Sequence, residues 1–323
     1  MRAVGIILAG GNNNRMKELT HKRAVAAMPI AGSYRSIDFA LSNMTNSHIQ
    51  KVAVLTQYNA RSLNEHLNSS KWWNFGRKQG GLYVFTPTIT NDNGYWYRGT
   101  ADAIYQNMDF LKKSHEPYVV IASGDAVYKM DYSKVLQYHI DKKADVTVVC
   151  KEMDPSDDVS RFGTIRMDDD MRITEFEEKP MVTKSNMIST GIYVIRRRLL
   201  IDLIEHAAEE ERFDFVNDVL IRYKNLKKIY GYKIDHYWSN IATVDAYYKT
   251  NMDFLKPEVR NYFFKQDPEI YSKVSDLPPA KYNPGASVKN SLVGSGSIIN
   301  GTVENSVIFK QVFVGNNCVI KNS

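Results

Sequence analysis

The chain has 323 residues, of which 43% are hydrophobic, and this length and composition suit a globular protein with one large and one smaller domain. Its formal net charge of +6 predicts anionic ligands, but Lys and Arg are spread along the chain, so we expect a small molecule and no nucleic acid. The two cysteines, Cys150 and Cys318, exclude a disulfide framework and suit a cytoplasmic location, and the absence of any run of about 18 apolar residues excludes a membrane-spanning helix.

The first expected element is an apolar strand at 4–8 that runs into the loop Gly10–Arg15. A glycine-started loop after a strand presents backbone N–H groups to phosphate oxygens. Asn13 stands where such a loop commonly keeps glycine. Asn tolerates left-handed backbone, so the turn is retained while the Asn13 side chain occupies space that a ligand needs.

Strands and helices then alternate: β-rich runs lie at 51–56, 118–122, 145–150 and 191–195, and helical stretches at 60–68 and 101–113. This alternation predicts an α/β domain over residues 1–256, with a mainly parallel sheet that helices cover on both faces. In such sheets, ligands bind beyond the carboxyl ends of the strands.

The end of the chain has a different pattern. Residues 257–283 are polar and rich in proline, which predicts a linker. From 284 to 323, apolar positions recur about every six residues, with Gly, Asn and Ser at the corners. This periodicity predicts a parallel β-helix that serves packing or oligomerisation, and a few antiparallel strands are the alternative. The repeat stops in mid-period at Ser323, which leaves room for further coils.

Ordered sequence blocks run through nearly the whole chain: they are 15–29, 32–43, 55–58, 96–107, 123–132, 178–180, 189–194, 237–248 and the hexapeptide tail. In this order they resemble the blocks of sugar-nucleotide pyrophosphorylases, and more narrowly those of ADP-glucose pyrophosphorylase (glucose-1-phosphate adenylyltransferase). The resemblance implies a Rossmann-like nucleotidyltransferase domain with a mainly parallel mixed sheet, followed by a left-handed parallel β-helix.

Members of that family join glucose 1-phosphate to the α-phosphate of ATP and release pyrophosphate. The reaction asks for loop amides and cations around the triphosphate, for carboxylates that hold Mg²⁺ and for a lysine on the sugar phosphate. The protein does almost no covalent chemistry, so losing charged groups from the site removes most of the rate.

The positioning residues of the family are present. By resemblance, the residues around the nucleotide are Gly10, Gly11, Gln57, Gly99, Thr100 and Ala101. By the same resemblance, glucose 1-phosphate is held by Glu178, Lys179, Ser189 and Gly191.

Several charged groups of the family are missing. Arg15 and the first metal carboxylate, Asp125, are retained, but Asn240 replaces the second metal carboxylate. Val25 replaces a lysine beside the phosphates, and Asn13 replaces a loop glycine. A neutral amide is a poor ligand for a hard dication, so we expect only weak metal binding at Asp125, with Mg²⁺ as a cofactor if any turnover remains.

These substitutions predict a regulatory subunit with little or no activity, similar to the GlgD-type partner of the bacterial glycogen enzyme. By resemblance, it would form a hetero-oligomer, a tetramer, with a catalytic homologue and modulate that partner. The expected ligands are ATP, ADP-glucose or a sugar phosphate. Two alternatives stay open: a slow Mg²⁺-dependent adenylyltransferase, and a sugar-phosphate sensor.

Overall fold

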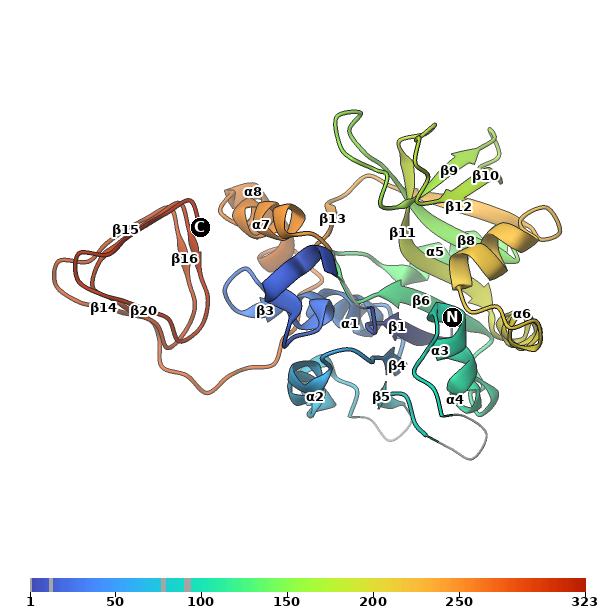
Figure 1. Cartoon of the computed structure of the whole chain (residues 1–323), viewed down its shortest axis with the longest axis horizontal. Coiled ribbons are helices and arrows are strands. Elements are labelled where there is room, and N and C mark those ends of the chain that lie inside the picture. Colours follow the sequence, from blue (N-terminus) through green and yellow to red (C-terminus); the bar gives the residue numbers. More distant parts are fainter. Residues whose placement is uncertain (1, 12–13, 77–79, 90–93) are drawn as a thin grey trace.

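The computed structural model describes residues 2–11, 14–76, 80–89 and 94–323, so the predicted loop residue Asn13 lies outside the described residues. Figure 1 shows an α/β body and, beside it, a triangular stack of strands at the end of the chain. Helices α7 (Val244–Asp253) and α8 (Pro257–Phe264) lie between the two.

A nine-stranded sheet forms the centre of the α/β body. Its strands are β1 (Ala3–Leu8), β4 (Lys51–Leu55), β5 (Gly81–Phe85), β6 (Tyr118–Ser123), β8 (Val146–Glu152), β9 (Gly163–Met167), β10 (Ile173–Glu178), β11 (Met187–Arg196) and β12 (Ile229–Ile234). The main path runs β10-β9-β11-β6-β1-β4-β5, and β8 pairs with both β11 and β12. Strands β6, β1, β4 and β5 are parallel, whereas β11 is antiparallel to β6, β8 and β9. The sheet is therefore mixed, with the predicted parallel pairing confined to part of it.

Helices cover both faces of this sheet (Figure 1). One core contains residues of α1 (Ser36–Asn46), α2 (Arg61–Leu67) and α5 (Tyr132–Asp141), and the other contains residues of α3 (Thr100–Gln106), α4 (Met108–Lys112) and α6 (Arg197–Glu209). Ile7 and Val120 belong to the first core, and their neighbours Ile6 and Val119 to the second. Because both faces are buried, the strands are continuous apolar runs. In the described residues, no helix is both long and apolar enough to cross a membrane.

Smaller elements complete the body: they are the short helices η1 (Asn14–Thr20), η2 (Val25–Ala27), η3 (Ser70–Trp73) and η4 (Phe215–Ile221), and the strands β2 (Pro29–Ile30), β3 (Tyr34–Arg35), β7 (Ala126–Tyr128) and β13 (Trp238–Asn240). Strands β7 and β13 form an antiparallel pair in which Asn240 lies opposite Ala126. This pair brings the segment around Asn240 next to the chain that leaves β6.

The segment 257–283, predicted as a linker, is structured at both ends. Helix α8 occupies its first eight residues, and the ring of Phe263 is fully buried against Phe39 and Phe254. At the other end, β14 (Lys281–Tyr282) pairs with β17 (Ile298–Ile299) of the C-terminal stack. The linker prediction is wrong at these two places. At the first of them, Pro257 stands in the first turn of a helix, where proline is tolerated.

The C-terminal stack consists of three short parallel sheets, which form the sides of the triangle in Figure 1. The first contains β14, β17 and β20 (Phe313–Val314), the second β15 (Ser287–Lys289), β18 (Thr302–Glu304) and β21 (Val319–Lys321), and the third β16 (Leu292–Val293) and β19 (Val307–Ile308). Ile299, Val303, Ile308 and Val314 fill the interior. The predicted stacking of short parallel strands is thus confirmed.

Candidate functional site

A pocket of about 150 Å³ lies beside the carboxyl end of β6. Five residues predicted from the sequence line it: Asp125, Glu178, Ser189, Gly191 and Asn240. Pockets for drug-sized ligands are typically larger than about 300 Å³, so this one suits a group of monosaccharide size better than a whole nucleotide sugar.

Asp125 and Asn240 are brought together by two neighbouring segments. Ser123, the last residue of β6, donates a hydrogen bond from Oγ to Oδ1 of Asp125 over 2.5 Å. The backbone N–H of Ile241 donates to the carbonyl oxygen of Asp125 over 3.0 Å, which ties the end of β13 to the segment between β6 and β7. The two residues predicted to flank the metal therefore line the same pocket.

The residues of this pocket do not fit a tightly held Mg²⁺ ion. Oδ1 of Asn240 accepts a hydrogen bond from the N–H of Ala242 over 3.0 Å, so the amide oxygen closes a local turn. Asp125 remains as the one carboxylate of the predicted pair. No group of three or more His, Cys, Asp or Glu is placed to hold a metal in the part of the chain that the structure describes. Mg²⁺ prefers several oxygen ligands in octahedral geometry.

A bulge in β11 shapes the sugar side of the pocket. The pairing of β11 with β8 shifts register between Ser189 and Tyr193. Gly191 lies in this bulge with φ +75°, a left-handed conformation that favours glycine. Oγ of Ser189 is 3.2 Å from the hydroxyl oxygen of Tyr193, whose pKa is raised by burial. Ser189, Thr190 and Gly191 all line the pocket, whereas a regular strand would turn the middle one of three successive residues to the other face.

Glu178 and Lys179 contact each other. The Nζ atom of Lys179 is 2.9 Å from Oε1 of Glu178, and the lysine side chain is 59% exposed while that of Glu178 is 16% exposed. The backbone of Lys179 has φ 48°, and its N–H donates to the carbonyl oxygen of Phe162. Glu178 lines the pocket, whereas Lys179 is not among the described residues that do.

Val25 and Arg15 also lie outside the lining of the pocket. Val25 is only 8% exposed and belongs to an apolar cluster with Met16, Val127 and Ile241. Arg15 is exposed on η1. The position where the family resemblance implies a lysine is therefore part of the core in this chain.

The side chain of Gln57, predicted to lie near the nucleotide, is hydrogen-bonded to the backbone of Tyr97. Nε2 of Gln57 donates to the carbonyl oxygen of Tyr97 over 3.2 Å, and the N–H of Tyr97 donates to Oε1 of Gln57 over 2.7 Å. A Cβ on Gly10 would lie 3.4 Å from the backbone nitrogen of Gln57, whereas one on Gly11 would meet nothing within 4 Å. Gln57 thus joins the first loop to the segment before α3.

The Gly99–Ala101 turn contacts the segment before η4. The N–H of Ala101 donates to the carbonyl oxygen of Phe213 over 2.8 Å, and Phe215 donates its N–H to Oγ1 of Thr100 over 2.9 Å. A Cβ on Gly99 would lie 2.3 Å from the same carbonyl oxygen of Phe213. These described residues are held together by protein contacts and do not line the pocket.

Arg161 and Trp238 are among the lining residues that the sequence did not predict as site residues. The guanidinium of Arg161 stacks over the ring of Phe162 at 4.6 Å, and its Nη1 donates to Oγ1 of Thr243 over 3.4 Å. Trp238 is buried, and its indole N–H has no hydrogen-bond partner among the described residues. Trp238 stood in a recognised block, so it could have been found, but nothing in the sequence places Arg161 beside Asp125.

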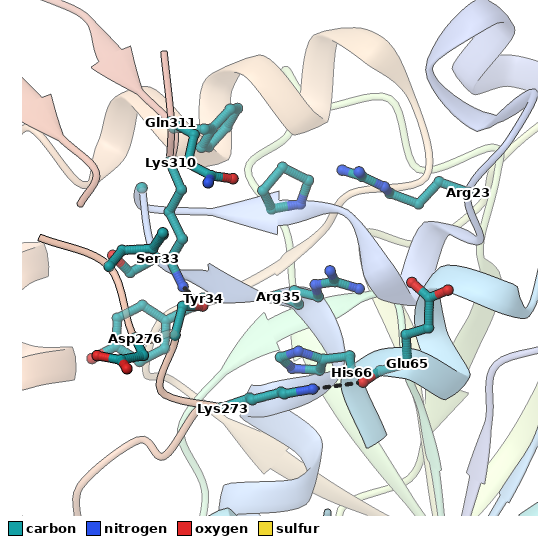
Figure 2. A pocket seen from close by; sticks show the side chains of 15 residues that line it. Arg23, Ser33, Tyr34, Arg35, Glu65, His66, Lys273, Asp276, Lys310 and Gln311 are labelled. Carbon is teal, nitrogen blue, oxygen red and sulfur yellow. Dashed lines mark hydrogen bonds between the residues drawn. The ribbon is translucent and has the colours of Figure 1, made fainter. Parts of the chain in front are cut away.

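A second, larger pocket of about 480 Å³ lies between the α/β body and the C-terminal stack. Figure 2 shows the basic side chains around it: Arg23, Arg35, Lys273 and Lys310. Lys273 donates to the carbonyl oxygen of Glu65 over 2.7 Å, and Lys310 donates to Oγ of Ser275 over 3.1 Å (Figure 2 marks the first bond). None of the four cations makes an ion pair with a carboxylate within the described ranges.

The charges in this second pocket favour an anion. Burial, and next the neighbouring Arg23, lower the pKa of Arg35. Burial likewise lowers the pKa of Lys310, with Arg35 adding to the effect and Asp38 opposing it. A phosphate or carboxylate bound here would compensate several positive charges at once. The sequence did not reveal this pocket, because its cations come from segments far apart in the chain.

Comparisons with known proteins agree with the fold. The family model described as "Nucleotidyl transferase" matches residues 4–257, which cover the α/β body. The α/β body is therefore that of a nucleotidyltransferase.

Relatives define the family more closely. A glucose-1-phosphate adenylyltransferase of Clostridium botulinum is 42% identical over 324 residues, which cover 99% of this chain and 83% of the relative. The enzyme of the same name from Thermosipho melanesiensis is 40% identical over 98% of this chain and 77% of the relative, and that of Geobacillus stearothermophilus is 39% identical over 99% and 83%. The chain belongs to the glucose-1-phosphate adenylyltransferase, or ADP-glucose pyrophosphorylase, family.

Proposed function

We propose that this chain is a regulatory, largely non-catalytic subunit of ADP-glucose pyrophosphorylase in cytoplasmic glycogen biosynthesis. One observation carries the proposal: two positions that would bring charge to the phosphates hold neutral side chains with other tasks in the fold. The side-chain oxygen of Asn240 accepts a hydrogen bond from the N–H of Ala242, and Val25 packs in an apolar cluster. Removing one preorganised charge-stabilising group typically costs about 10²–10³-fold in rate, so losing two leaves little activity.

The remaining lining of the small pocket supports binding without turnover. Glu178 and Ser189 supply polar groups for sugar hydroxyls, and the bulge at Gly191 leaves room for the ring. The ligand we propose is a sugar phosphate or the glucosyl part of ADP-glucose, with ATP as the other candidate.

The partner we propose is a catalytic homologue that makes ADP-glucose and pyrophosphate from ATP and glucose 1-phosphate. The two chains would form a hetero-oligomer, a tetramer, and this chain would alter the partner's rate or its response to an effector. The C-terminal stack, with the left-handed winding that the resemblance implies, would supply part of the contact. The basic pocket beside this stack is where an anionic effector would bind.

The alternative function is slow, Mg²⁺-dependent adenylyltransferase activity of the chain itself. The observation that favours it is Asp125, which still lines the pocket and could ligate a metal together with oxygens of ATP.

Three assays of ADP-glucose formation separate the two functions: this chain alone, the catalytic homologue alone, and the mixture. We expect the chain alone to be at least about 10²-fold slower than the homologue, and the mixture to differ from the homologue in rate or effector response. The matched control is the mixture made with the Asp125→Ala variant, which should modulate the partner as the wild type does. Turnover of the isolated chain that requires Mg²⁺ and is lost in the Asp125→Ala variant, with no effect of the chain on the homologue, would support the alternative instead.

A further inference from the structure

The small pocket contains few charges. Three of the described residues that line it are acidic or basic: Asp125, Glu178 and Arg161. Glu178 is already paired with Lys179. A phosphate that enters the pocket therefore meets the carboxylate of Asp125 and the guanidinium of Arg161.

A divalent cation is poorly placed to overcome the repulsion between Asp125 and a phosphate. The amide oxygen of Asn240 accepts a hydrogen bond from the N–H of Ala242, and Oδ1 of Asp125 accepts one from the hydroxyl of Ser123. One partly engaged carboxylate is a weak site for Mg²⁺, which binds water strongly and demands well-placed oxygen ligands. Positive charge at this site must then come from the protein.

Arg161 is held in position to supply that charge. Its guanidinium lies over the ring of Phe162, and one of its several N–H donors bonds to Thr243. Its remaining donors have no partner in the described part of the chain. The contacts with Phe162 and Thr243 restrict the side chain, so less conformational entropy is lost when it binds a ligand.

The charges around Arg161 agree with this role. Burial lowers the pKa of its guanidinium, and the neighbouring Asp158 and Asp125 oppose this effect. Arg15 adds to the effect of burial on Arg161, and Asp157 opposes it, so both guanidinium groups lie near Asp158. An arginine keeps its proton at neutral pH, so Arg161 brings a fixed positive charge to the pocket.

We infer that Arg161 takes the place of the divalent cation in this chain, and that the pocket binds the phosphate of a sugar 1-phosphate without Mg²⁺. A guanidinium offers two parallel N–H donors to phosphate oxygens. The inference deepens the proposed function and rests on it for the identity of the ligand.

Isothermal titration calorimetry of the full chain with glucose 1-phosphate tests this inference. The titration is done once in buffer with EDTA and once in buffer with MgCl₂. We expect dissociation constants that agree within about twofold. In Arg161→Met, which keeps the length of the apolar stem, we expect binding to weaken at least about tenfold, the equivalent of one charge-assisted hydrogen bond. Arg161→Lys, which keeps the charge and loses the fork, should fall between the two.

The matched control is Arg166→Met on neighbouring β9, whose guanidinium contacts Glu175 and the carbonyl oxygen of Lys184 at the surface. It should bind as the wild type does, and melting curves of both variants establish that they fold. Binding that needs Mg²⁺, unchanged binding by Arg161→Met, or no binding by the wild type in either buffer would overturn the inference. The proposed function fails by a different result, the absence of any effect on the catalytic homologue.

Discussion

The side-chain oxygen of Asn240 accepts a hydrogen bond from the backbone N–H of Ala242 over 3.0 Å. The residue at the place of a metal carboxylate is therefore part of a turn, and Asp125 lines the pocket beside it. An aspartate at position 240 can keep the bond to Ala242 with one oxygen and offer the other to a cation beside Asp125.

We predict that Asn240→Asp creates a Mg²⁺ site. Its melting temperature should rise by a few degrees when MgCl₂ replaces EDTA, because a cation that binds only the folded state stabilises it. The wild type should show a much smaller rise. The control is Asn240→Asp combined with Asp125→Asn, which restores a single carboxylate and should abolish the effect. An equal rise in the wild type would show that Asp125 alone suffices.

The fold was largely predictable because its signals are local. Strands such as β1 and β6 are buried on both faces, and so appear as apolar runs between glycines and polar residues. Helix α8 was missed, since Pro257 and the polar residues after it suggest a break until one knows that Phe263 is buried. The proline begins the helix here.

The candidate site was predictable only where the family blocks carry it. Asp125, Glu178, Ser189, Gly191 and Asn240 do meet in one pocket. Their surroundings depend on tertiary contacts that no local pattern encodes.

Two such contacts changed the site. Lys179 pairs with Glu178 at the surface, and Arg161 reaches the pocket by stacking on Phe162. Val25 likewise looked like a lost charge in the sequence, and the structure adds that the space has been filled by an apolar cluster.

Val25→Lys should therefore destabilise the chain instead of restoring activity. An ammonium group placed among Met16, Val127 and Ile241 has no carboxylate partner there among the described residues, so we expect a loss on the order of 2 kcal/mol or more in the free energy of unfolding. Urea denaturation measures this loss. Val25→Leu, a change of size alone, serves as the control and should cost clearly less. A lysine variant as stable as the wild type would mean that the side chain reaches water.

Gly99→Ala tests the contact between α3 and the segment before η4. The new Cβ would lie 2.3 Å from the carbonyl oxygen of Phe213. This clash can be relieved only if the backbone moves. We expect a loss of about 1–3 kcal/mol in the free energy of unfolding. Gly11→Ala, whose Cβ would meet nothing within 4 Å, is the matched control and should change it by less than about 0.5 kcal/mol. Equal effects of the two variants would refute the steric reason.

Acid should destabilise the chain in part through His139. This residue is buried, its Nδ1 lies 2.9 Å from Oγ1 of Thr147, and its pKa is lowered to about 4 by burial, with Arg196 adding to the effect and Asp145 opposing it. An unfolded histidine has a pKa of about 6.5. The folded state therefore binds the proton less readily, and the free energy of unfolding falls as the pH drops from about 6.5 to about 4.

Between pH 7 and about pH 4.5, the free energy of unfolding should fall by about 2 kcal/mol less in His139→Gln than in the wild type. Urea denaturation at the two pH values measures this difference. The comparison within each variant removes the cost of the substitution itself. The exposed His115, replaced in the same way, is the control and should leave the acid loss unchanged. If His139→Gln lost as much stability as the wild type, other groups would account for the acid sensitivity.

The last prediction concerns assembly with the proposed catalytic partner. Ile298 of β17 and Phe313 of β20 are register partners on one outer side of the C-terminal stack, and they are 38% and 66% exposed. Adjacent apolar side chains on a regular, flat surface favour contact with another protein. We expect Ile298→Ser with Phe313→Ser to weaken association with the catalytic homologue at least about tenfold, as measured by size-exclusion chromatography with light scattering over a range of concentrations.

Val319→Ser, on another side of the stack and 62% exposed, is the matched control for a change in surface polarity, and Asp125→Ala is the control for the pocket. Both should associate as the wild type does. A double variant that still co-migrates with the partner at the same concentrations would place the contact in the α/β body, and the C-terminal stack would then serve the fold of this chain alone.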